Sequence, residues 1–224
     1  AGAAEARGVK VPKGMIRGGA VETLVRNTNG VDAENRYTLV FSDFSSMIDG
    51  PSPGGGAASY NTPWLEGLDP VCAAASLAEQ AKAASQAAPL PSSLRLPVFI
   101  APGELGAMLD MLVGTAVSAD SVHRNRSQWA GKLGQQVASP DVTIVDDPGD
   151  PRAVLSAPYD DEGAPTAVRP MVENGILRSY LYDAHASSVE GRAPSGNGLR
   201  RGPDNAQYVF RGGISPGHFN LVFR

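Results

Sequence analysis

The residues best suited to acid–base or metal chemistry are acidic clusters and three histidines. Asp160–Asp161–Glu162–Gly163 could hold a hard cation or act as a paired acid and base. A solvated turn closed by the glycine is the commoner use of such a cluster, and Asp146–Asp147–Pro148–Gly149 is also interpreted as a turn. His123, His185 and His218 are far apart and have neither an i, i+4 partner nor a CxxC companion. The sequence therefore contains no zinc signature of the usual spacing, and each histidine is interpreted as a surface or structural residue.

Two glycine-containing segments could bind a ligand through their backbone. Gly54–Gly55–Gly56 lacks a following Lys and does not begin a helix, so it predicts a flexible loop rather than a phosphate cradle. Arg192, Arg200 and Arg201 surround Ser195–Gly196–Asn197–Gly198, which predicts a small basic loop, either solvated or binding a carboxylate. No Gly-x-Ser-x-Gly elbow identifies a nucleophile.

Strands and helices must position these residues. Extended segments are predicted at residues 20–27, 35–48, 94–101, 141–146, 168–173 and 176–183. Asn174–Gly175 joins the last two as a hairpin, because both residues accept positive φ. A loop is predicted from Pro51 to Pro63, and a helix over 69–85 with Asp69 as its N-cap. Apolar residues recur at helical spacing over 105–117, which predicts a second long helix.

Together these elements predict an α+β fold with mixed, mostly antiparallel sheets and helices packed on one side. The 224 residues, with a net charge of −4, suit one domain or two small ones, and the mild acidity argues against nucleic acid as a partner. We expect no membrane segment, because the longest apolar run carries Asp110 in its middle. Cys72 is the single cysteine, which fits a reducing compartment, although its role is not defined by the sequence. The chain begins without Met and ends within a strand-like run, so we interpret it as a piece of a longer protein.

A series of motifs in a fixed order resembles the TldD/PmbA family, once described as modulators of DNA gyrase and now regarded as peptidases of cytoplasmic peptides. The motifs are Ala119–Asp120–Ser121–Val122, Arg126–Ser127, Ala130 to Ser139, Val142 to Asp147, Asp160 to Pro165, Glu173 to Leu177 with Tyr180–Leu181, and Ser195–Gly196–Asn197. Asn27–Thr28–Asn29–Gly30 and the Ala-rich helix agree more loosely. The resemblance implies that 1–92 is the middle domain and 93–224 the first part of a barrel-like C-terminal domain, with the N-terminal domain and the C-terminal end absent.

The resemblance also bears on metal binding. TldD-type members carry His-Glu-x-x-x-His on the helix before the Ala-Asp element, where the histidines bind zinc and the Glu acts as general base. The corresponding residues here are Asp110, Met111 and Thr115. Met111 cannot accept a proton, and a threonine hydroxyl is a poor zinc ligand. The pattern is that of the metal-free PmbA/TldE kind, so we expect no catalytic residue, metal or cofactor in this chain and zinc in a TldD-type partner.

The resemblance implies a cytoplasmic subunit that pairs with a TldD-type subunit, or with itself, around a cavity holding an unfolded peptide. Candidate cavity residues are Gly131, Gly134, Asp160, Asp161, Glu162, Gly163, Ser195, Gly196 and Asn197. The glycines could admit a peptide backbone or could simply shape tight turns. Two alternatives stay open: a non-proteolytic interaction or regulatory module, and a metallopeptidase that uses Asp110 with non-standard ligands. Whether the chain is itself an enzyme is therefore undecided by its sequence.

Overall fold

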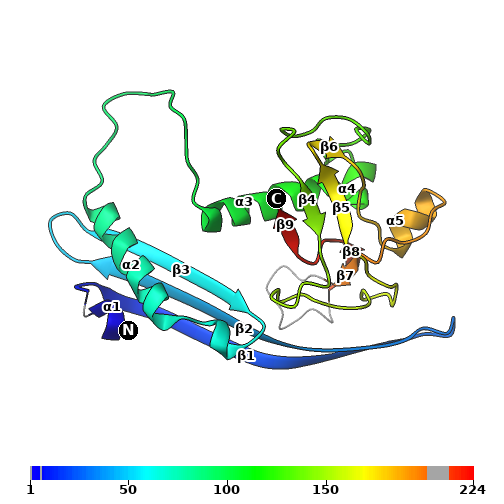
Figure 1. Cartoon of the computed structure of the whole chain (residues 1–224), viewed down its shortest axis with the longest axis horizontal. Helices are drawn as coiled ribbons and strands as arrows, with labels where there is room; N and C mark the ends of the chain where they lie inside the picture. The colour runs from blue at the N-terminus through cyan, green and yellow to red at the C-terminus, as the bar shows by residue number, and fades with distance from the viewer. Residues whose placement is uncertain (1, 6, 201–211) are drawn as a thin grey trace. The chain divides into compact units, whose positions relative to one another are not determined.

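The computed structural model describes residues 2–5, 7–200 and 212–224. The chain divides into two compact units (Figure 1). Unit 1 comprises Ala1–Val21, Tyr37–Val98 and Arg152–Val154; unit 2 comprises Glu22–Arg36, Phe99–Pro151 and Leu155–Arg224. The α+β prediction is confirmed, because antiparallel sheets and helices make up both units.

Unit 1 is built on a three-stranded sheet in the order β1-β2-β3. The strands are β1 (Lys10–Arg26), β2 (Asp32–Ile48) and β3 (Gly54–Thr62); the first two continue into unit 2 as a hairpin. The short helix α1 (Gly2–Glu5) precedes the sheet, and the 3₁₀ turn η1 (Leu65–Gly67) follows it. Helix α2 (Pro70–Ser85) packs on the sheet. Its Asp69 cap is confirmed, since the side chain accepts hydrogen bonds from the backbone N–H groups of Val71 and Cys72.

The predicted glycine loop is wrong, because Gly54–Gly55–Gly56 begins strand β3 and pairs with the end of β2. A Cβ atom at Gly54 would lie 2.1 Å from the carbonyl oxygen of Ala81 on α2. A Cβ at Gly56 would lie 2.9 Å from the carbonyl oxygen of Leu77. The glycines therefore allow the helix backbone to lie directly against the strand. Ser46 on β2 donates a hydrogen bond to the same Leu77 carbonyl over 2.8 Å.

Unit 2 contains a four-stranded sheet in the order β6-β5-β4-β9 and a two-stranded sheet of β7 and β8. The strands are β4 (Ile144–Asp146), β5 (Arg169–Glu173), β6 (Ile176–Leu177), β7 (Gly198–Arg200), β8 (Ile214–Pro216) and β9 (Leu221–Phe223). The Asn174–Gly175 hairpin between β5 and β6 is confirmed, with φ of 50° and 76°. Among the described residues, the two sheets of unit 2 are open, so the barrel-like prediction is not met.

The helices of unit 2 are α3 (Pro102–Val117), α4 (Ala119–His123) and α5 (Ala184–Val189). The core of the unit joins the C-terminal end of α3 to the sheet through side chains that include Val113, Val117, Met171 and Leu181. Leu181 also exchanges backbone hydrogen bonds with Val117 and Ala119.

The sequence overestimated burial before and within α3. The predicted strand over 94–101 is wrong: these residues have no regular structure and are exposed, Phe99 by 91%. Leu105, Met108 and Leu112 on α3 are also exposed, whereas Val113 and Ala116 are buried. The spacing of apolar residues therefore predicted the helix correctly. It did not predict which turns of the helix would be buried against the rest of the described residues.

Candidate functional site

Helix α3 carries the three residues that the sequence aligns with the metal motif. Met111 lies on this helix, as predicted, and is 68% exposed. Thr115 is exposed as well. Asp110 accepts a hydrogen bond from His218, with 2.6 Å between Oδ1 and Nε2. His218 belongs to the connection between β8 and β9, so two segments far apart in the sequence meet at the motif.

The imidazole lies against the helix at Gly114. A Cβ atom at that position would be 3.0 Å from Cε1 of His218 and 3.3 Å from Nδ1. Because glycine carries no side chain, the ring reaches the helix surface between positions 110 and 115. The His218 side chain is only 7% exposed, whereas the Asp110 side chain is 62% exposed.

This donor set does not fit zinc. Protein zinc sites use three or four side chains drawn from Cys, His and carboxylates. Here Asp110 and His218 are two potential zinc ligands that are already hydrogen-bonded to each other. Neither the thioether of Met111 nor the hydroxyl of Thr115 is a usual zinc ligand. No group of three His, Cys, Asp or Glu side chains suited to a metal ion occurs among residues 2–5, 7–200 and 212–224.

The second candidate region joins the acidic turn to the Ser195–Asn197 loop. Oδ1 of Asp160 accepts hydrogen bonds from the N–H groups of Glu162 and Ala164, and Oδ2 accepts from the N–H of Gly198 over 2.8 Å. A Cβ at Gly196, which has a φ of 73°, would lie 2.2 Å from the carbonyl oxygen of Pro165. The structure thus brings these two groups of predicted site residues into direct contact.

The other carboxylates of this turn also bond to the chain's own backbone. Asp161 accepts from the N–H of Arg200, and Glu162 accepts from the N–H of Ala184 over 2.6 Å. Burial raises the pKa of Asp160 and of Glu162, although hydrogen bonds from backbone N–H groups partly offset that rise. The acidic turn is therefore a structural junction: Asp160 and Asp161 both hold strand β7, and Glu162 holds the start of helix α5.

The third candidate region is centred on Asp146, which was predicted from the sequence to lie in a turn. Its side chain is fully buried at the end of β4. It accepts hydrogen bonds from the N–H groups of Phe219 and Asn220 and from Nδ2 of Asn197, over 2.7 to 2.9 Å. Burial raises the pKa of this carboxyl despite these bonds. The signal in the sequence was the position of Asp146 at the end of an apolar strand.

Ser195 extends the Asp146 network. Its hydroxyl donates to the carbonyl oxygen of Tyr182 or to Oδ1 of Asn197, and accepts from the N–H of Tyr182. Nη2 of Arg169, on β5, donates to the carbonyl oxygen of Ser195 over 2.8 Å. The loop is thus held by residues of three separate segments.

The tip of the β1–β2 hairpin packs on the acidic turn. Gly163 has a φ of 82°, and a Cβ there would lie 2.2 Å from Cγ1 of Val31. The side chain of Asn27 accepts hydrogen bonds from the N–H groups of Asn29 and Val31 and so shapes the tip. The turn over 27–30 and the acidic turn, which were separate motifs in the sequence, are neighbours in unit 2.

The remaining predicted cavity residues lie elsewhere. Gly131 and Gly134 are exposed turn residues with positive φ, and the N–H of Gly134 donates to the carbonyl oxygen of Leu177. No hydrogen bond recorded among the described residues joins these two glycines to the acidic turn. Arg201, which the sequence placed in the basic loop, lies outside the described residues.

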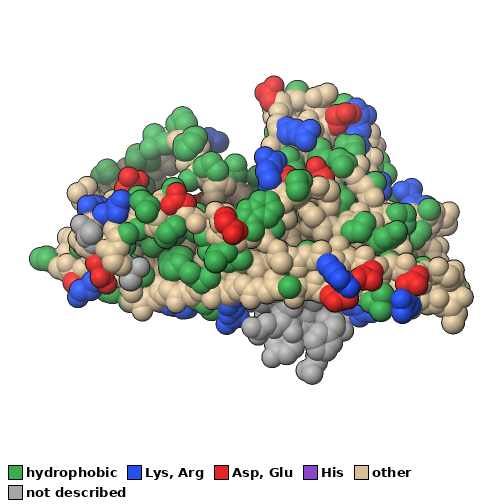
Figure 2. All heavy atoms as spheres, turned by 60° about the horizontal axis from the view of Figure 1, so that its bottom comes forward, with side chains coloured by type: hydrophobic (Ala, Val, Ile, Leu, Met, Phe, Trp, Pro, Cys, Tyr) green, Lys and Arg blue, Asp and Glu red, His purple; other side chains and the backbone are tan. Residues whose placement is uncertain are grey.

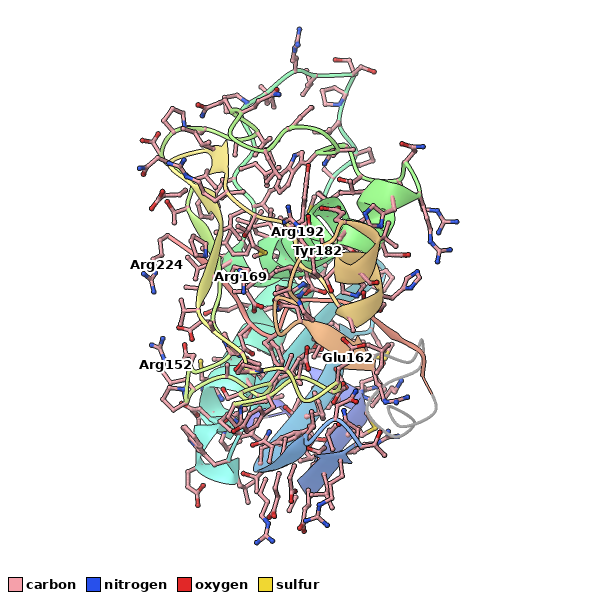
Figure 3. The ribbon with its side chains drawn as sticks, turned by 90° about the vertical axis from the view of Figure 1, so that its right-hand side faces the viewer. Arg152, Glu162, Arg169, Tyr182, Arg192 and Arg224 are labelled. Carbon is pink, nitrogen blue, oxygen red and sulfur yellow. The ribbon has the colours of Figure 1, made fainter. Side chains whose placement is uncertain are left out.

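Sequence reasoning missed a polar cluster around Glu190. This residue accepts hydrogen bonds from His123 over 2.8 Å and from the hydroxyl of Tyr182 over 3.0 Å, and forms an ion pair with Arg192. The Arg192 guanidinium lies 4.6 Å from the centre of the Tyr182 ring (Figure 3). Burial and the bond to Glu190 raise the pKa of Tyr182 to about 12. Burial alone would raise the pKa of Glu190. The hydrogen bonds from His123 and Tyr182 and the charge of Arg192 outweigh burial, so the pKa of Glu190 lies below its usual range.

On the face drawn in Figure 2, basic and acidic side chains of the described residues are interspersed. None of the helices in the described part of the chain has the length and apolar character needed to cross a membrane.

The fold and the site together define a metallopeptidase-related protein whose motif helix lacks a zinc ligand set. The family model of the PmbA/TldA metallopeptidase C-terminal domain matches residues 93–224, more than half of the chain. The chain belongs to the TldD/PmbA family.

Curated relatives agree with this assignment. The chain is 33% identical to an uncharacterised protein of Methanocaldococcus jannaschii over 78% of its own length and 40% of the relative's. It is 35% identical to a metalloprotease TldD homologue of Haemophilus influenzae over 47% of this chain and 22% of that protein. The chain thus spans less than half of these relatives.

Solved structures share the fold. A protein from Thermotoga maritima, titled as a modulator of DNA gyrase, superposes with a TM-score of 0.78 and 29% identity over 96% of this chain and 46% of that chain. TldE from Thermococcus kodakarensis also gives a TM-score of 0.78, at 21% identity over 94% of this chain and 46% of the other. The second likeness concerns the fold alone.

Proposed function

We propose that this chain belongs to a PmbA/TldE-like, non-catalytic subunit that joins a TldD-type metallopeptidase subunit and helps to enclose an unfolded peptide in the cytoplasm. Residues 1–92 would be its middle domain and 93–224 the first part of its C-terminal domain. The observation that carries the proposal is the donor set of α3, where Asp110 is hydrogen-bonded to His218 and Met111 stands at the position that the resemblance assigns to the general base.

The chemistry of peptide hydrolysis supports this assignment. A metallopeptidase needs a metal that lowers the pKa of bound water and a nearby group that accepts its proton. A thioether accepts no proton at ordinary pH, so Met111 cannot take the second role. The catalytic chemistry would therefore belong to a partner subunit that carries zinc.

The contribution of this chain would be to hold the peptide. Extended peptides are recognised by backbone hydrogen bonds from strands and loops. Asp160, Asp161 and Glu162 bond to the backbone of their own chain, so in this proposal they shape the cavity wall rather than contact the peptide. The glycines at 131, 134 and 196 would be points where a peptide backbone can approach.

Two measurements test the proposal. Elemental analysis of untagged protein, supplied with zinc and then dialysed, is expected to give zinc well below one atom per chain. Co-expression with a TldD-type subunit is expected to give a stable complex, and peptidase activity should require the metal motif of that subunit. About one zinc per chain, or activity of this chain alone, would overturn the proposal.

An interaction module without a role in proteolysis is the second candidate. The exposed apolar side chains Leu105, Met108 and Leu112 on α3 favour a docking role of some kind. This candidate predicts that a TldD-type subunit fails to bind, whereas the first requires binding.

A further inference from the structure

We infer that, in this chain, the hydrogen bond between Asp110 and His218 replaces a bound metal ion. This hydrogen bond joins α3 to the β8–β9 connection, as a metal ion would. A metal at the motif would link the helix to a ligand from another segment. Here a hydrogen bond makes the corresponding link without a metal. The inference uses the metal-free helix of the proposed function but does not depend on any partner subunit.

The helix side of the link is formed by one face of α3. Asp110 and Gly114 are four residues apart and therefore lie one above the other on the helix surface. The imidazole of His218 contacts both, through the 2.6 Å hydrogen bond at Asp110 and through its close approach to Gly114. Thr115, the second position that carries a histidine in the zinc motif, follows Gly114 directly and is exposed.

The other side of the link is fixed by the buried network of unit 2. The two residues after His218 donate their N–H groups to Oδ1 of Asp146, over 2.8 and 2.9 Å. Gly217, directly before it, exchanges hydrogen bonds with Asn197 through its own N–H and carbonyl groups. Hydrogen bonds of the backbone on both sides of His218 in the chain thus fix the position of its imidazole independently of its contact with the helix.

The arrangement implies that His218 already stands where a third zinc ligand would be needed. We expect histidines introduced at 110 and 115, the two motif positions on α3, to supply together with His218 three imidazole ligands of the kind that zinc accepts. No histidine is needed from outside this chain. A double substitution should therefore create a zinc site that depends on His218.

The first experiment introduces Asp110→His together with Thr115→His into the untagged chain and titrates it with Co²⁺ and Zn²⁺. We expect absorption bands typical of four- or five-coordinate Co²⁺ and an affinity at least about 100-fold above that of the unaltered chain. Adding His218→Ala should weaken binding at least about tenfold. His185→Ala, which removes an exposed histidine on α5, is the matched control and should change nothing. Failure of the double variant to bind, or equal binding without His218, would overturn the inference.

A second experiment tests the link in the absence of any metal. Asp110→Ala alters an exposed side chain, so the chain should still fold. Hydrogen exchange is expected to become faster, by at least about threefold, at the amides of 112–117 and of β9. Asp120→Ala, which removes an exposed carboxylate paired with Arg124, is the control for loss of charge. Unchanged exchange in Asp110→Ala would contradict the link, whereas zinc bound by the unaltered chain would instead refute the proposed function.

Discussion

The two units of this chain use opposite means to hold distant segments together. In unit 1, small residues let the backbone of α2 lie directly on β3, and the ion pair between Lys10 and Asp49 is exposed. In unit 2, buried carboxylates accept backbone N–H groups from segments more than thirty residues away, as Asp146 and Asp160 do.

The difference indicates where precise positioning is needed. Close packing of small side chains is tolerant, because dispersion is not directional. A buried carboxylate that accepts several N–H groups fixes the geometry of loops, and it is costly to leave its donors unpaired. The loops that carry the cavity residues predicted from the family resemblance all lie in unit 2.

The largest expected effect is at Asp146. Asp146→Ala leaves the N–H groups of Phe219 and Asn220 and the amide of Asn197 without their acceptor, which should cost unit 2 about 3–5 kcal/mol. Urea unfolding monitored by Trp129, which is buried in unit 2, in a Trp64→Phe background measures this loss. Asp43→Ala in unit 1 removes an exposed carboxylate that accepts from Ser59, and should cost less than about 1 kcal/mol. If Asp146→Ala and Asp43→Ala lowered the free energy of unfolding equally, buried carboxylates would not distinguish unit 2 from unit 1.

The next effect concerns close packing in unit 1. Gly54→Ala places a Cβ 2.1 Å from the carbonyl oxygen of Ala81, so α2 must shift at a cost of about 2–3 kcal/mol. Gly55→Ala is the matched control, because its Cβ would lie 3.6 Å from the nearest atom, and it should be neutral or slightly stabilising. Fluorescence of Trp64 in a Trp129→Phe background reports unit 1 alone. If Gly54→Ala left the free energy of unfolding of unit 1 unchanged, the backbone of α2 would not pack directly on β3.

A smaller effect tests the contact between the hairpin tip and the acidic turn. Gly163→Ala combines a φ of 82° with a collision at Val31, whereas Gly191→Ala has a φ of 63° and open space around its Cβ. Both variants carry the backbone penalty, about 1 kcal/mol, and Gly163→Ala should cost about a further 1–2 kcal/mol. Adding Val31→Ala should recover part of that excess. If the two glycine variants lost the same free energy of unfolding, the hairpin tip would not pack against the acidic turn.

The smallest effect is a pH dependence from the exposed side of unit 2. The partners of Glu190 hold its pKa below the unfolded value, so its contribution to stability is present near neutral pH and is lost as pH falls through that lowered pKa. Glu190→Gln should therefore destabilise by about 0.5–1 kcal/mol at pH 7, and the difference should vanish in acid. Urea midpoints of both proteins from pH 7 to pH 3 measure this. Glu173→Gln, at an exposed pair with Arg178, should show little of either effect, and a pH-independent loss at Glu190 would contradict the assigned cause.

The sequence by itself determined most of the local structure and the family. Asp69 began its helix and Asn174–Gly175 made its hairpin because capping and positive φ depend on a few adjacent residues. The absence of His, Glu and His at 110, 111 and 115 was likewise visible without a fold.

Only the tertiary structure decided the roles that depend on distant neighbours. Gly54–Gly56 became a strand because it pairs with the end of β2 beneath α2. Asp146 became a buried acceptor because the segment after His218 returns to β4. His218 itself reaches Asp110 across 108 positions of the chain. No local pattern encodes such a meeting, because it depends on how separate strands and helices pack, and packing is set by the whole sequence rather than by the residues on either side.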